Sequence, residues 1–166
     1  MRINLVVLMV SLLLGGCDQS TPEQKGFAGM GNQALAFTPV VPGRVFSFPA
    51  DHGAHDGFRI EWWYVTANLK DQQGNQFGVQ WTLFRSALKP LAEQAGWADQ
   101  TIWLGHAAVT SSTVHHAVER YARGGVGQAG VQLAPFEAWI DDWRFASQAQ
   151  DPMSDLQLSA RDKDFA

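Results

Sequence analysis

Cysteine is nearly absent from this sequence, since among its 166 residues there is one, Cys17. No internal disulfide can form, so a fold held together by disulfides is excluded. Several catalytic and nucleotide-binding motifs are missing as well: a Gly-x-Ser-x-Gly nucleophile elbow, a cysteine–histidine pair, a phosphate-binding loop and a dinucleotide fingerprint. We expect no cofactor and no bound metal.

Basic residues are fewer than acidic ones, with 12 lysines and arginines against 16 aspartates and glutamates. Removal of residues 1–16, argued below, takes away Arg2 and leaves 11 against 16, a net charge of −5. An acidic protein with scattered basic residues is a poor match for nucleic acid, which we exclude as a partner. No stretch after Cys17 is apolar over the roughly 20 residues that a membrane-spanning helix needs.

The N-terminus has the pattern of a secretory signal. Arg2 precedes an apolar run, Ile3–Leu14, that is too short to span a bilayer but has the length of a signal-peptide core. The run ends in Leu14-Gly15-Gly16-Cys17, which resembles a bacterial lipobox, after which the cysteine is acylated and becomes the mature N-terminus. Asp18 resembles the signal that keeps such lipoproteins at the inner membrane. We therefore predict a lipoprotein on the periplasmic side of that membrane.

The remaining chain divides into two parts. Residues 17–43 are rich in proline, glycine, glutamine and serine and are predicted to be a lipidated tether. Residues 44–166 are predicted to form one β-domain. The chain stops after a strand-like segment without a turn or cap, so we expect this domain to be incomplete.

The clearest fold signal is a β-hairpin. Residues 60–69 and 76–86 are rich in β-branched and aromatic side chains, and a three-residue loop with Gly74 in the left-handed conformation connects them. This loop places Glu61 opposite Arg85 and makes the face that carries this pair apolar up to that last rung.

Other segments also have strand patterns. Further strands are predicted for residues 101–110, 114–123, 136–145 and 155–161, with a short first strand at 44–49. Residues 87–100 should form a loop or one helical turn, with Trp97 available to pack over the barrel end, and residues 124–130 a flexible connection. About seven short strands indicate an all-β fold, either an antiparallel barrel or a sandwich.

Ionisable groups gather in the turn before the hairpin, namely Asp51, His52, His55 and Asp56. The two histidines have the spacing to share a metal, but zinc needs a third ligand and a fixed second shell. Hydrogen-bonded capping of strand ends is one alternative, and a general acid or base is another. The Glu61–Arg85 pair likewise has two interpretations: a structural ion pair, or an acid or base (Glu61) held by Arg85 at the barrel mouth.

A third candidate acid is Asp141. If residues 136–145 are one strand, Asp141 lies between Trp139 and Trp143 on one face, where loss of hydration favours the protonated carboxyl. The alternative is a hydrogen-bonded aspartate in a tryptophan-lined core. Arg120 is expected to pair with Asp141 or Asp142 across the sheet.

Seven tryptophans are many for this length. They either fill a barrel or help to line a cavity for an elongated apolar ligand with a polar end. The predicted lining residues are Trp62, Tyr64, Gln80, Thr82, Phe84, Trp139 and Trp143. His106 is predicted to be a core histidine with its hydrogen bonds satisfied.

Six ordered motifs carry a family resemblance, namely 48–55, 61–66, 80–85, 105–110, 119–123 and 135–143. Together they resemble the AttH family of secreted lipocalin-like proteins, which is related to carotenoid 1,2-hydratase. The resemblance implies a tandem pair of lipocalin-like (calycin-type) barrels, of which this chain holds the first. Family members are often labelled predicted secreted hydrolases, and some are encoded beside ABC transporters, which implies such a transporter as partner. The hydratase's catalytic carboxylate matches no residue here, so its activity is not carried over.

Two function hypotheses follow. The first is a membrane-anchored periplasmic lipoprotein that binds or processes a hydrophobic small molecule in a lipocalin-like cavity, in the service of an ABC transporter. The second is an enzyme of hydrolase or hydratase type that uses Glu61 or Asp141, or His52 and His55, on such a molecule.

Overall fold

The computed structural model of the chain describes residues 37–149 and 153–165. The predicted signal peptide, the lipidation site Cys17 and most of the predicted tether lie outside the described residues. The elements in chain order are η2 (Ala50–His52), β1 (Ile60–Lys70), β2 (Gln76–Ala87), η3 (Gly96–Ala98), β3 (Thr101–Thr110), β4 (His115–Arg123), β5 (Ala129–Leu133), β6 (Phe136–Ile140), β7 (Trp143–Ser147) and β8 (Leu156–Ser159).

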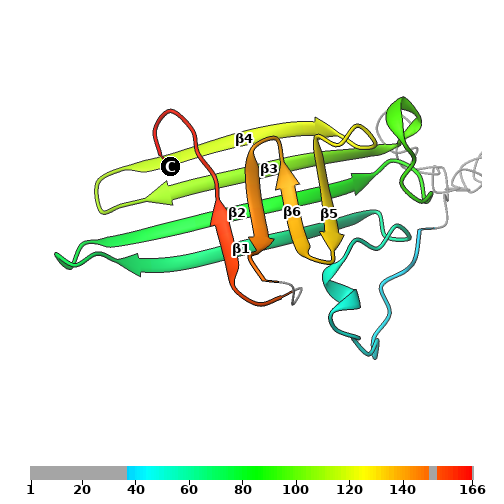
Figure 1. Cartoon of the computed structure of the whole chain (residues 1–166), viewed down its shortest axis with the longest axis horizontal. Coiled ribbons are helices and arrows are strands. Elements are labelled where there is room, and N and C mark those ends of the chain that lie inside the picture. The colour runs from blue at the N-terminus through cyan, green and yellow to red at the C-terminus, as the bar shows by residue number, and fades with distance from the viewer. Residues whose placement is uncertain (1–36, 150–152, 166) are drawn as a thin grey trace, which may run out of the picture. The chain divides into compact units, whose positions relative to one another are not determined.

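The strands form two antiparallel four-stranded sheets, β1-β2-β3-β4 and β5-β6-β7-β8, in which each strand pairs with its neighbour in sequence. Figure 1 shows the short strands of the second sheet crossing the long strands of the first at a steep angle. The prediction of an all-β antiparallel fold is confirmed. The described strands make two open sheets packed face to face, and do not close into one hydrogen-bonded barrel.

The predicted hairpin has the predicted register. Glu61 lies opposite Arg85 and Val65 opposite Trp81 along β1 and β2. The Asp71 N–H donates to the Asn75 carbonyl at 3.0 Å, and Gly74 has a φ of 93°. Because side chains alternate between the two faces of a strand, this register decides which residues of β1 and β2 face the core.

The core lies between the sheets. The first sheet contributes Trp81, Leu83, Trp103, Ala107 and Ala122, and the second contributes Ala129, Phe136, Ala138, Ile140 and Trp143. Close approach of the layers depends on Gly105 in β3, because a Cβ atom there would lie 2.7 Å from Ile140 Cγ2. That distance is too short for a van der Waals contact.

The predicted strand at 136–145 is wrong, because the chain reverses in its middle. Asp141 has a φ of 54°, and β6 and β7 pair so that Ile140 lies opposite Trp143. Aspartate tolerates the left-handed conformation better than most residues, which permits this short hairpin loop.

Three smaller expectations also need correction. Residues 44–49 contain no strand, and β5 begins at Ala129, inside the segment expected to be a flexible connection. Trp97, expected to pack over an end of the barrel, lies in η3 with 78% of its surface exposed. The expected helical turn within 87–100 is the short η3.

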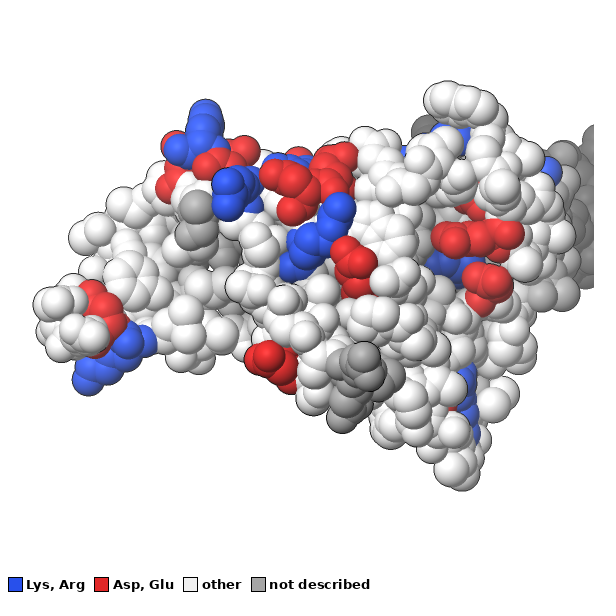
Figure 2. All heavy atoms as spheres, viewed as in Figure 1, with Lys and Arg blue, Asp and Glu red and all other residues white. Residues whose placement is uncertain are grey.

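Charged side chains on the face shown in Figure 2 gather in a few patches that mix both signs, separated by uncharged surface. Within residues 37–149 and 153–165, no helix is long and apolar enough to cross a membrane.

Candidate functional site

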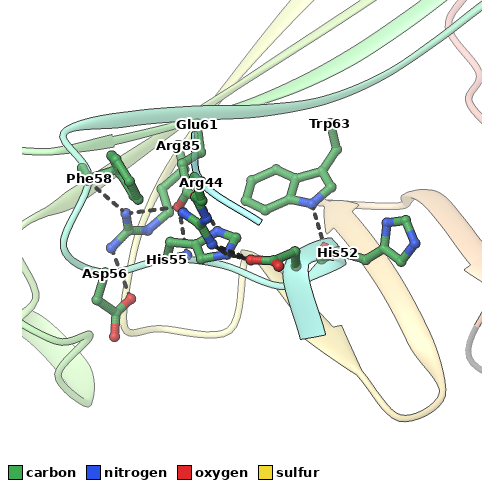
Figure 3. A network of polar contacts seen from close by, with 9 residues as sticks. Arg44, His52, His55, Asp56, Phe58, Glu61, Trp63 and Arg85 are labelled. Carbon is green, nitrogen blue, oxygen red and sulfur yellow. Dashed lines mark hydrogen bonds and ion pairs between the residues drawn. The ribbon is translucent and has the colours of Figure 1, made fainter. Parts of the chain in front are cut away.

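A network of ionisable side chains joins the turn before β1 to strand β2 (Figure 3). At its centre, His55 Nδ1 lies 2.6 Å from Glu61 Oε1, and His55 Nε2 lies 2.9 Å from Asp51 Oδ1. The backbone N–H of His55 donates to Glu61 Oε2 at 2.8 Å. When both carboxylates are ionised, both ring contacts can be hydrogen bonds at once only if the imidazole carries both protons.

Arg44 offers the same imidazole a second arrangement. Its Nη2 donates to Asp51 and also lies 3.1 Å from His55 Nε2. An arginine N–H can donate only to an unprotonated ring nitrogen. His55 therefore has a partner for Nε2 in either protonation state: Arg44 when Nε2 is bare, and Asp51 when it is protonated.

Asp51 is held in its ionised form. Hydrogen bonds from the Ser47 backbone N–H and from His55, with the positive charge of Arg44, lower the pKa of Asp51 from 3.8 to about 2. The network therefore holds the His55 imidazole against a carboxylate whose ionised form is favoured by its surroundings.

Arg85 closes the other side of the network and is completely buried. Its Nη2 donates to Asp56 Oδ1 at 3.0 Å, and its Nη1 lies 3.4 Å from Glu61 Oε2 and 3.3 Å from the Phe58 carbonyl oxygen. The ion pair between Glu61 and Arg85 that the register predicts is present. Through these contacts Arg85 connects β2 to the turn before β1, in addition to pairing with Glu61 across the hairpin.

The structure separates the two histidines. His52 contributes its carbonyl oxygen, which accepts a hydrogen bond from Trp63 Nε1 at 2.8 Å, while its ring lies against Phe48 and points away from His55 (Figure 3). Within the described part of the chain, no set of three or more histidine, cysteine, aspartate and glutamate side chains is arranged to hold a metal ion. Arg44 is the member of the network that sequence reasoning missed.

Asp141 does not lie between two indoles, so the reason for predicting it to be an acid is wrong. The pairing of β6 with β7 puts Trp139 and Trp143 on opposite faces of the second sheet. Asp141 Oδ1 accepts a hydrogen bond from Gln128 Nε2 at 2.8 Å in the loop region. Arg120 makes the expected contacts, pairing with Asp142 and lying 3.8 Å from Asp141. Its hydrogen bond lowers the pKa of Asp142.

The seven predicted lining residues do not surround one cavity. Trp62, Tyr64, Gln80, Thr82 and Phe84 lie on the face of the first sheet that points away from the core, where Trp62 and Tyr64 are 56% and 63% exposed. Trp143 is buried between the sheets, and Trp139 lies on the far side of the second sheet.

His106 is also misplaced by the prediction, since it shares the outer face of the first sheet with Thr82. Its Nε2 lies 3.4 Å from Glu119 Oε1, and its side chain is 39% exposed. It is not a core histidine.

A cavity of about 270 Å³ does lie between the two sheets, where β8 and the segment after it cover β2 and β3. Its walls include Val79, Trp81, Ala107, Val109, Leu158 and Phe165. The Nε1 of the completely buried Trp81 has no hydrogen-bond partner among the described residues, nor do Trp103 Nε1 and Arg85 Nε. A buried donor without an acceptor costs about 1–3 kcal/mol.

Residues 39–166 match the family model described as AttH-like. The chain belongs to the AttH-like family. A solved relative of this AttH-like chain is a protein of Nitrosomonas europaea described as a candidate AttH, with 32% sequence identity and a TM-score of 0.56. The match covers 75% of our chain and 37% of the relative, so the chain spans well under half of that protein. No curated protein shows significant similarity to the chain.

The family assignment agrees with the resemblance found in the sequence. The matched region begins at residue 39, inside the predicted tether. In the structure the Thr38 N–H donates to the Gly57 carbonyl at 2.7 Å, so residues just before 44 already contact the domain.

Proposed function

We propose that this AttH-like chain binds a hydrophobic small molecule that carries one hydrogen-bond acceptor. The observation that carries the proposal is the cavity of about 270 Å³ between the sheets, which is lined in part by Trp81, whose indole N–H has no partner among the described residues. Ligand sites are typically apolar concavities with a small number of polar groups that orient the ligand. Trp81 is the orienting donor in this proposal.

The size of the cavity limits the ligand. It lies just below the common range of roughly 300–1,000 Å³, so a bicyclic aromatic molecule, or one end of a longer chain, fits it. Each square ångström of apolar surface that the ligand buries contributes about 25 cal/mol before the costs of association.

We further infer a lipid anchor on Cys17 and a place on the periplasmic face of the inner membrane, with an ABC transporter as the partner. The lipobox-like sequence supports the anchor, and the family resemblance supports the transporter. The mass of the intact full-length protein from a bacterial host tests the anchor, because acylation at Cys17 adds a diacylglyceryl group and a third acyl chain.

Two measurements test ligand binding. Solvent extraction of the full-length protein, followed by mass spectrometry, should release an apolar compound that the bulk lipid extract lacks. Separately, titration with acetylnaphthalene should show saturable binding. Ala107→Leu fills the cavity and should weaken this binding by roughly tenfold or more.

The matched control is Ala117→Leu, which adds the same side chain on the outer face of β4. It should leave the affinity unchanged. Unfolding curves of both variants show whether Ala107→Leu remains folded, and Val79→Phe is the second filling variant. Binding that is equal in all four proteins would contradict the proposal.

A second candidate function is acid–base chemistry at His55. The observation that favours it is the imidazole held between the Glu61 and Asp51 carboxylates. If the extracted compound is converted on incubation with the protein, Glu61→Gln and His55→Gln should slow the conversion by roughly 10² or more. Unchanged turnover in both variants would remove the enzyme interpretation.

A further inference from the structure

Large apolar side chains are exposed along one short loop before η2. Their exposed fractions are 89% for Val40, 57% for Val41, 89% for Val45, 63% for Phe46 and 64% for Phe48. Single exposed apolar residues are normal on protein surfaces, but a contiguous group indicates a contact with another molecule or a membrane.

The loop is fixed to the domain, so its exposure is built into the fold. Before the loop, Thr38 is bonded to Gly57, and within it Arg44 is paired with Asp51. The Arg44 guanidinium carbon also lies 5.6 Å and 5.7 Å from the ring centres of Phe46 and Phe58. These contacts fix the loop to the domain, while Val40 and Val45 each keep 89% of their surface exposed.

The loop carries no acidic side chain, and its one arginine, Arg44, is paired with Asp51 outside the loop. Between Thr38 and Pro49 the only ionisable side chain is Arg44. Its described hydrogen bonds all use Nη2, which leaves the other guanidinium N–H groups for a phosphate. The lower right corner of Figure 2, where Figure 1 places this segment, is almost wholly uncharged apart from a small basic patch.

We propose that residues 39–48 are a membrane-contact loop, which places its valine and phenylalanine side chains in the interfacial layer of a phospholipid bilayer and Arg44 at the level of the phosphates. Apolar and aromatic side chains flanked by a basic group favour that layer. Insertion stays shallow, because the backbone of an irregular loop cannot leave its N–H and C=O groups without partners in hydrocarbon.

The inference rests on the proposed lipid anchor. Pro39 follows Cys17 by 22 residues, so the loop lies within roughly 75 Å of an anchored Cys17 even if the chain between them is fully extended. The anchor supplies the high local concentration that a small apolar patch needs for stable contact.

Spin labelling at position 45 tests the loop directly. Full-length Val45→Cys is made in a bacterium, reconstituted in phosphatidylethanolamine–phosphatidylglycerol vesicles and labelled with a nitroxide. Gln73→Cys, in the exposed β1–β2 loop, is the matched control. An acylated Cys17 is a thioether and takes no label, so the mass of the labelled protein shows separately whether the anchor has formed.

The label at position 45 should collide with a water-soluble nickel chelate roughly threefold less often than the label at 73, and more often with oxygen. Equal nickel accessibility at both positions contradicts the membrane contact of residues 39–48, even when the mass shows that every molecule carries the anchor. Exclusion of both reagents, with dipolar coupling between labels, also overturns it, because another copy of the chain would then cover the patch. Two labels per molecule show instead that the proposed anchor has failed, which also overturns the inference that rests on it.

Discussion

Arg85 determines the charge balance of the turn before β1. It is completely buried and contacts Asp56, Glu61 and the Phe58 carbonyl. A buried ion pair adds little net stability, but removal of one partner leaves the other uncompensated. Removal of Arg85 is therefore expected to cost much more stability than its ion pairs add.

Arg85→Met should therefore lower the free energy of unfolding by about 3–5 kcal/mol in urea denaturation of the full-length protein. Arg59→Met removes an exposed arginine from the neighbouring segment and should change it by less than about 0.5 kcal/mol. Similar small effects of both substitutions would show that Arg85 is dispensable for the turn.

Asp51 should make the protein sensitive to acid in a defined interval. Its pKa falls from 3.8 to about 2 on folding, so its contribution to stability is complete above 3.8 and is lost as the pH falls toward 2. Urea denaturation at several pH values between 5 and 2 should show a steeper loss for the natural protein than for Asp51→Asn. Parallel curves for the two proteins would contradict the lowered pKa of Asp51.

At this scale the sequence located part of the site. The hairpin register brought Glu61 and Arg85 together, and the sequence placed His55 in one turn with Asp51, since both are local signals. The contact between His55 and Glu61 was not predicted. Arg44 was missed because an irregular loop, whose course depends on tertiary contacts, carries it to Asp51. Asp141 was misjudged because an Asp-Asp pair without glycine or proline is a weak signal for the reversal of the chain.

At the scale of elements, the contact between the sheets depends on a glycine. A Cβ at Gly105 would lie 2.7 Å from Ile140 Cγ2, whereas one at Gly78 in the same sheet would lie 3.7 Å from Thr110 Cβ. A methyl group at position 105 would therefore push β3 and β6 apart, whereas one at position 78 would make an ordinary van der Waals contact.

Gly105→Ala should destabilise the protein by about 1–3 kcal/mol through this overpacking. Gly78→Ala should be neutral, or stabilising by a few tenths of a kcal/mol, because alanine is less flexible in the unfolded chain. The thermal transition temperatures of the two variants and of the natural protein test this prediction. Equal transition temperatures for the two variants would contradict the close packing of β3 against β6 at Gly105.

The elements also show why hairpins differ in predictability. The β1–β2 loop contains a glycine at the left-handed position, between two long strands with a clear two-residue period. The β6–β7 loop is an Asp-Asp pair without glycine or proline, between strands of five residues each. A run of ten residues without a turn signal therefore predicts one strand, although tertiary packing selects two.

For the whole molecule, the two faces of the first sheet have different surroundings. One face is buried against β5–β8, while the other exposes Trp62, Tyr64 and Tyr121. The sequence predicted the β1–β2 register, which assigns the side chains of these two strands to the two faces. It could not show which of them borders a cavity, because that depends on how the second sheet crosses the first.

The central claim is that Trp81 in the cavity between the sheets orients an apolar ligand. Indole ¹H–¹⁵N spectra of the full-length protein test it most directly, with the Trp81 signal assigned by Trp81→Phe. Acetylnaphthalene should shift that signal downfield as its carbonyl accepts the hydrogen bond. Ethylnaphthalene, which has the same shape and no acceptor, should shift it much less, and Trp63 and Trp143, which already donate to carbonyls, should move little with either. An unmoved Trp81 signal, with shifts confined to the exposed Trp62 and Trp97, would contradict the account.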